Sequence, residues 1–169
     1  MRATLHGVFM LIFSVFQATW LDYIEVFSVK PNMFLVYVII ICSFCKKSEG
    51  AGVGFAFGIV LDMLIGRFWG LNALFMMLLG FFTAHFCERL LRDNNLLISL
   101  LLVFVVSFLY ETLYGIISYP VLGNSGLGPM FLKIIIPESF YNIVVAIPLH
   151  FVLKRIAKVL YSDKGESIG

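Results

Sequence analysis

Apolar residues run through this chain in long uninterrupted segments, each closed by a short group of polar or charged residues. No segment alternates apolar and polar residues in the way that the strands of a membrane barrel do. A helix that crosses a hydrocarbon layer of about 30 Å needs roughly 20 apolar residues, because each residue adds about 1.5 Å. The pattern therefore predicts an all-α integral membrane protein, a compact bundle of about six transmembrane helices joined by short loops.

Polar groups set the expected limits of these helices; Lys46 and Lys47, for example, close the second apolar segment. The predicted spans are residues 3–21, 33–45, 50–65, 71–87, 96–119 and 131–153, followed by a cytoplasmic tail over 154–169. The first span ends on bulky residues around Trp20, where a signal-peptide cleavage site would have small ones, so we expect it to be retained. Residues 1–169 are expected to form a single transmembrane domain.

Composition supports the membrane class. The chain is 61% hydrophobic and 13% charged, whereas a soluble domain is about 45–50% apolar and about 25% charged. The net charge of +2 is small, and no basic stripe with interleaved aromatic residues occurs. The sequence therefore predicts that the chain lies in the lipid bilayer and has no nucleic-acid partner.

The basic residues predict the orientation of the bundle. With the N-terminus inside, the inner segments carry nine of the 12 basic residues: Arg2, Lys46, Lys47, Arg89, Arg92, Lys154, Arg155, Lys158 and Lys164. The outer segments carry the other three: Lys30, Arg67 and Lys133. Short cytoplasmic loops are enriched in Lys and Arg, so both termini are predicted to be cytoplasmic, which requires an even number of spans.

Three acidic residues, Asp62, Glu111 and Glu138, lie inside predicted spans, where ionisable groups are costly and often functional. By residue count, all three fall within roughly 6–12 Å of the outer boundary. One interpretation is an outward-facing polar pocket or a notch that binds a partner or a ligand. The other is a packing network, since buried polar groups find hydrogen-bond partners. The candidate partners of the carboxyl groups are Tyr110, Tyr114, Tyr141, Asn142 and Asn72.

Glycines recur every four residues in the third span, at Gly50, Gly54 and Gly58, and Asp62 and Gly66 continue the series. Residues four apart share a helix face, and small residues on that face let another helix approach closely. We expect these four glycines to be helix-packing positions. The pattern does not say whether the partner helix belongs to this chain or to another.

No catalytic constellation is predicted. Residues 123–126 read Gly-Asn-Ser-Gly, like the serine motif of rhomboid proteases. However, His150 would lie roughly 25 Å deeper than this outer loop, too far to act as the base. The sequence therefore predicts a protein that is not an enzyme.

No metal or cofactor is predicted either. Cys42 and Cys45 form a CxxC without a second pair, and at a cytoplasmic helix end we expect them to be reduced packing residues. His85 and Glu88 share a helix face, but two ligands do not make a metal site. The sequence has no Walker loop, no HExxH and no dinucleotide fingerprint.

The order of several motifs is similar to that of one bacterial membrane family. These motifs are Lys30-Pro31-Asn32, Gly54-xxx-Gly58-xx-Leu61-Asp62, Gly66, Gly70-Leu71-Asn72-Ala73-Leu74, Tyr141-Asn142 and Lys154-Arg155. In this order, and over nearly the whole chain, the sequence resembles the rod shape-determining protein MreD family. The agreement is most specific from Lys30 to Ala84, although arginine would be more usual than lysine at position 30.

The resemblance implies a non-enzymatic component of the cell-elongation complex, which makes lateral peptidoglycan in the bacterial cytoplasmic membrane. It implies an MreC-like bitopic partner and, through that partner, MreB-like filaments and peptidoglycan synthases. An alternative is a small-molecule-binding transporter subunit, since the family is thought to resemble the substrate-binding subunits of energy-coupling-factor vitamin transporters. That second likeness concerns the fold and does not carry function across.

Overall fold

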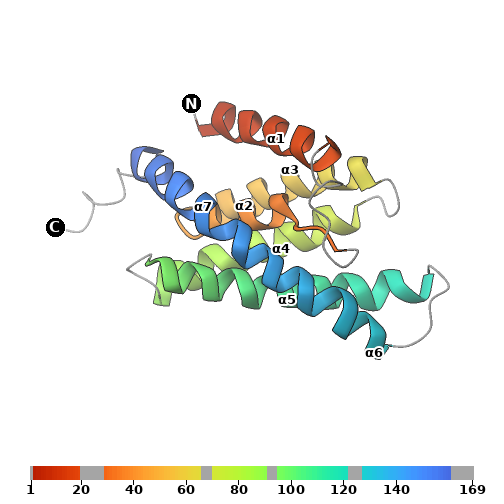
Figure 1. Ribbon diagram of the computed structural model, residues 1–169. Helices are drawn as coiled ribbons and strands as arrows, with labels where there is room; N and C mark the ends of the chain where they lie inside the picture. The colour runs from red at the N-terminus through yellow and green to blue at the C-terminus, as the bar shows by residue number, and fades with distance from the viewer. Residues whose placement is uncertain (1, 20–28, 66–69, 91–94, 122–126, 161–169) are drawn as a thin grey trace.

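The computed structural model describes residues 2–19, 29–65, 70–90, 95–121 and 127–160, and all of its regular elements are helices (Figure 1). The helices are α1 (Arg2–Thr19), α2 (Met33–Cys42), α3 (Lys47–Ile65), α4 (Leu71–Leu90), α5 (Leu96–Val121), α6 (Leu127–Met130), a π-helical turn η1 (Phe131–Ile135) and α7 (Ile136–Leu160). The helical class predicted from the sequence is confirmed.

The long helices lie side by side and run alternately in opposite directions (Figure 1). Consequently, the first residues of α1 and the last residues of α7 lie at one end of the bundle, on the left in Figure 1. We call this the terminal end. The last described residues of α1, α3 and α5 lie at the other end, which we call the loop end.

Four helical segments are long and apolar enough to cross a membrane: Lys47–Ile65, Leu71–Glu88, Leu96–Ser118 and Gly128–Lys158. Two apolar helices in the described ranges are shorter, Thr4–Gln17 and Met33–Cys42. Many of the exposed side chains on these helices are large and hydrophobic, as expected of surfaces that face lipid. The chain is therefore a membrane protein, while the count of six spans and the orientation remain predictions.

Helix α2 is the centre of the bundle. It is ten residues long, and every residue from Phe34 to Cys42 is buried. It contacts α1, α3, α4, α5 and α7. A helix that is hydrophobic all round is one that is buried on all sides. The segment predicted as a span over 33–45 is thus a short central helix that ends at Cys42 and is about 15 Å long.

The last helical segment is longer at both ends than predicted. It begins at Leu127 with α6 and continues through η1 into α7, which extends to Leu160. Pro137 explains the π-helical turn, because it has no N–H to donate to the carbonyl of residue 133. The N–H of Ile136 instead donates to Phe131. Residues 154–160, predicted as part of a polar tail, are helical.

The glycines of the third predicted span pack α3 against α4. Any Cβ built on Gly50, Gly54 or Gly58 would come within 2.7 Å of a backbone atom of α4. On Gly54, for example, it would overlap the carbonyl group of Met76. The helix that approaches these three glycines therefore belongs to the same chain. Gly66, the fourth predicted packing position, lies outside the described residues.

Candidate functional site

Asp62 holds the first turn of α4. It lies on α3 and is 3% exposed. Its Oδ2 accepts hydrogen bonds from the backbone N–H groups of Gly70 and Ala73, both at 3.0 Å. Its Oδ1 accepts from the backbone N–H of Asn72 at 3.2 Å and from the Asn72 side chain at 3.0 Å. The carboxylate therefore does for α4 what an N-cap side chain usually does, from a neighbouring helix.

Gly70 makes this arrangement possible. Its φ of +93° lies in the left-handed region, which residues with a Cβ rarely adopt. In this conformation its N–H points to Asp62, while its carbonyl accepts the first helical hydrogen bond of α4, from Leu74 at 2.9 Å. The Gly-Leu-Asn sequence at positions 70–72 is thus a helix start completed by Asp62.

The Asp62 network extends to α5. The hydroxyl of Tyr110 donates to Oδ1 of Asn72, and both residues are buried. Three helices are therefore connected through one carboxylate, one amide and one phenol. For Asp62, this geometry matches the packing-network interpretation of the sequence.

A second polar network connects α2, α5 and α7. Asn32 caps α2, since its Oδ1 accepts from the N–H of Leu35 at 3.0 Å. The backbone N–H of Asn32 donates to Oδ1 of Asn142 at 2.8 Å, and the Asn142 amide donates to Ser107 at 3.2 Å. Asn142 is completely buried. These bonds fix the extended segment that enters α2 against the two longest helices.

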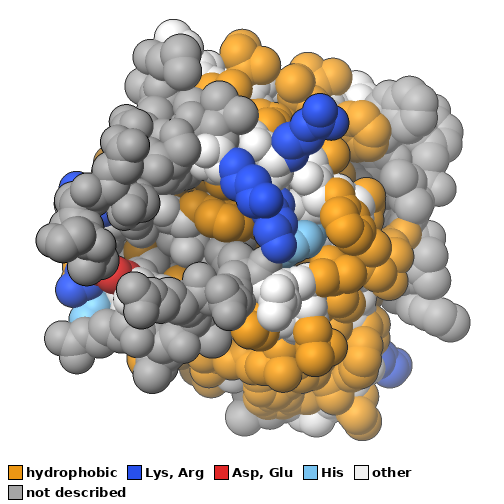
Figure 2. All heavy atoms as spheres, turned by 90° about the vertical axis from the view of Figure 1, so that its left-hand side faces the viewer, with side chains coloured by type: hydrophobic (Ala, Val, Ile, Leu, Met, Phe, Trp, Pro, Cys, Tyr) orange, Lys and Arg blue, Asp and Glu red, His pale blue; other side chains and the backbone are white. Residues whose placement is uncertain are grey.

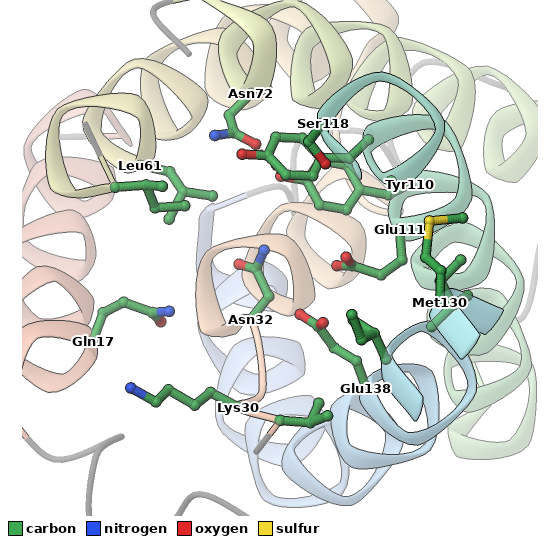
Figure 3. A pocket seen from close by; sticks show the side chains of 16 residues that line it. Gln17, Lys30, Asn32, Leu61, Asn72, Tyr110, Glu111, Ser118, Met130 and Glu138 are labelled. Atoms are coloured by element: carbon green, nitrogen blue, oxygen red, sulfur yellow. Dashed lines mark hydrogen bonds between the residues drawn. The ribbon is translucent and has the colours of Figure 1, made fainter. Parts of the chain in front are cut away.

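Between the two networks lies a cavity of about 530 Å³ (Figure 3). Its polar lining comprises Gln17, Lys30, Asn32, Asn72, Tyr110, Glu111, Tyr114, Ser118 and Glu138. Its apolar lining comprises Val29, Leu61, Ile65, Gly115, Met130, Ile134 and Ile135. These residues come from every helix of the fold, with α2 represented by the segment that enters it. The volume lies within the range of about 300–1,000 Å³ that is usual for ligand pockets.

Two of the three predicted acids meet in this cavity. Glu111 on α5 and Glu138 on α7 point into it from one wall, and their carboxyl groups face each other in Figure 3. Glu111 is 7% exposed, and its buried Oε1 has no hydrogen-bond partner. Asp62 does not line the cavity. Its hydrogen-bond partner Asn72 does. The acids predicted at similar depth are therefore divided between a packing network and a cavity.

Sequence reasoning did not assign Gln17 or Lys30 to the site. Lys30 precedes a predicted span, and Gln17 is a neutral residue within one. The signal that could have found Lys30 is Pro31-Asn32, a helix-start pattern that places residue 30 at the loop end. Gln17 carried no comparable signal.

The terminal end of the bundle has a different character. The basic residues whose side chains are described there are Lys46, Lys47, Lys154, Arg155 and Lys158. Lysine and arginine side chains are prominent in the view of that end (Figure 2). Lys47 pairs with Glu88 at 3.9 Å, and both side chains are more than one-third exposed. This surface pair contributes about 0–1 kcal/mol. At the loop end the described basic residues are Lys30 and Lys133, so the basic asymmetry predicted from the sequence is visible in the fold.

Within the described residues, the other candidate motifs add no site. Cys42, Cys45 and Cys87 are buried and form no disulfide. No group of three or more His, Cys, Asp or Glu side chains within the described ranges could hold a metal ion. Ser125 of the protease-like motif lies outside the described residues.

Comparison with known proteins gives the family. No curated protein and no solved structure matches the chain. The family model of the rod shape-determining protein MreD matches residues 1–159, which include all of α1 to α6 and nearly all of α7. This coverage and the apolar helical bundle agree with the family resemblance read from the sequence. The chain belongs to the rod shape-determining protein MreD family.

Proposed function

We propose that the protein is a non-enzymatic, multi-pass component of the cell-elongation complex in the bacterial cytoplasmic membrane. In this role it binds an MreC-like bitopic protein and helps to position peptidoglycan synthases, with MreB-like filaments as indirect partners. The observation that carries the proposal is the family match over residues 1–159, since the family determines rod shape.

The described structure is consistent with a scaffold. Its helices leave wide apolar surfaces exposed, for example at Leu11, Leu101, Leu132 and Phe151, which are each at least 60% exposed. In a membrane such surfaces contact lipid or the transmembrane helix of a partner. The α3–α4 pair, closely packed through glycine, supplies a framework for that contact.

The test combines capture with complementation. The tagged full-length chain is expressed in a rod-shaped host that lacks its own member of the family, and bound proteins are captured after crosslinking. We expect rods to be restored and a bitopic MreC-like protein to be captured. Round cells together with a folded, membrane-inserted chain that captures no such protein would contradict the proposal.

A second candidate function is small-molecule binding by a transporter-like subunit. The cavity of about 530 Å³ with its two acids favours it. The two functions are not exclusive, because the cavity lies inside the bundle whereas a scaffold would use its outer surface.

A further inference from the structure

We propose that the cavity at the loop end binds a small organic cation, with its ammonium or guanidinium group seated between Glu111 and Glu138. This inference rests on the second candidate function, small-molecule binding, and is independent of the shape-determining one. It assigns to the two acids a ligand of defined chemical class.

The first argument is the unpartnered oxygen of Glu111. Its Oε1 is buried and bonded to no described group, and its side chain points into the cavity (Figure 3). Buried polar atoms are nearly always hydrogen-bonded, so an acceptor left open beside a cavity indicates that a donor comes from the cavity. An ammonium or guanidinium group consists of such donors.

The second argument is the charge of the wall. Glu138 faces Glu111 there, so two carboxyl groups share one low-dielectric volume, where both can be ionised together only with a counter-charge between them. A cation in that position donates a charge-assisted hydrogen bond to each carboxylate. Lys30 lines the same cavity, but its amino end points away from the two acids in Figure 3. The lysine is therefore not placed between them.

The third argument is size and lining. A lone metal or ammonium ion would leave most of a 530 Å³ cavity unfilled. Beside the acids, the wall offers the rings of Tyr110 and Tyr114 and the aliphatic side chains of Leu61 and Ile135. Aromatic faces attract organic cations, and the apolar part of a ligand would lie against the aliphatic side chains. The lining thus fits an amine with an apolar body.

The test uses dansylcadaverine, a fluorescent primary amine with an apolar body, and its N-acetyl derivative, which has the same body without the charge. Each is titrated into the full-length protein in lipid nanodiscs, with protein-free nanodiscs as background. We expect the amine to bind at least about tenfold more tightly than the acetylated compound, the factor that one charge-assisted hydrogen bond supplies. Equal binding of the two compounds would overturn the proposal.

Variants locate the site. Glu111→Gln and Glu138→Gln should each remove most of the preference for the amine, while Glu88→Gln, an acid at the terminal end, should leave it unchanged. An unchanged preference in the first two variants would also overturn the proposal. These outcomes are separable from the shape-determining function, because that function is read from rod shape and partner capture rather than from dansyl binding.

A second measurement keeps the acids intact in case their variants do not fold. Ser118→Cys places a thiol in the cavity wall. Its ratio of reaction rates with a cationic and an anionic methanethiosulfonate should exceed the ratio of a small thiol in solution at least about tenfold, because an acidic cavity concentrates cations. Dansylcadaverine should slow the reaction with the cationic reagent. A ratio equal to that of the small thiol, or no protection by the amine, would contradict a cation site.

The same experiment separates a free cation from a basic side chain supplied by a partner. Dansylcadaverine is titrated into the chain together with the partner that it captures. Retained binding supports a free small molecule as the ligand. Loss of binding in the complex would overturn that part of the proposal, because the partner would then occupy the cavity.

Discussion

At the scale of single residues, the clearest assignment is that of Asp62, whose two oxygens accept four hydrogen bonds from the start of α4. A packing network was one of the two interpretations that the sequence allowed for this acid, since an unpaired carboxylate is costly inside the bundle. The sequence could not predict that both oxygens accept. That detail depends on how residues 70–73 approach α3, and it changes what a substitution does.

Asp62→Asn should destabilise the protein, even though asparagine has nearly the same shape. One of the two oxygens would become an NH₂ group facing backbone donors, so about two hydrogen bonds would be lost, at about 1–3 kcal/mol in total. Asp62→Leu removes all four and should prevent folding. Unfolding of the purified variants in detergent measures the order of their stabilities. Glu88→Gln is the control, because neutralising this acid should change the stability little. An Asn variant as stable as the parent chain would contradict the capping role.

Gly70→Ala should destabilise the same turn through the backbone alone. The Cβ would meet nothing within 4 Å, but the φ of +93° costs a residue other than glycine about 1–2 kcal/mol. The same unfolding measurement tests this, and Gly128→Ala, which also has open space around it, is the matched control. Equal stability of the two variants would argue against a left-handed residue 70.

At the scale of elements, hydropathy predicted where the helices lie but not what surrounds them. Most predicted spans begin and end within a few residues of the observed helices. The apolar residues of the 33–42 helix, however, are buried against other helices and do not face lipid. Hydropathy does not distinguish burial in protein from exposure to lipid. Glycine at every fourth residue of the third predicted span predicted that another helix approaches it closely. The identity of the approaching helix became clear only from the structure.

Gly54→Leu or Gly58→Leu should separate α3 from α4 and abolish stable folding, because the added side chain would overlap backbone atoms that cannot move independently. Gly52→Leu is the matched control: it lies on the same helix, and a Cβ there meets nothing within 4 Å. The yield of monodisperse protein in detergent is the measurement. If all three variants behave alike, the glycines do not mediate the packing.

At the scale of the whole molecule, a polar pocket near one end of the bundle was one of the two interpretations that the sequence allowed for the acids, and its form could not be predicted. Counting residues from the helix ends placed the three acids at similar depth, and this estimate needs only the rise per residue of a helix. The cavity depends on side chains from helices far apart in sequence, among them Gln17 and Tyr110. No single segment carries that information, so the separation of Asp62 from the other two acids could not be predicted.

Both termini should be cytoplasmic if the basic terminal end faces inward. Lys133→Cys at the loop end and Lys158→Cys at the terminal end are both at exposed positions. The first should react with an impermeant maleimide added to intact cells, and the second only after the cells are opened. The three native cysteines are buried and should contribute little background. The reverse pattern would place the cavity on the cytoplasmic side.

The shortness of α2 explains why the molecule has an interior space. The central helix is about half as long as the hydrocarbon layer is thick, and the chain that enters it, from Val29 to Asn32, is part of the cavity wall. The cavity occupies the half of the bundle axis that α2 leaves open. Two further helical turns before Met33 would plug that space and leave the outward faces of the bundle untouched. A plugged variant would therefore show whether cell shape depends on an open interior or on the outer surface alone.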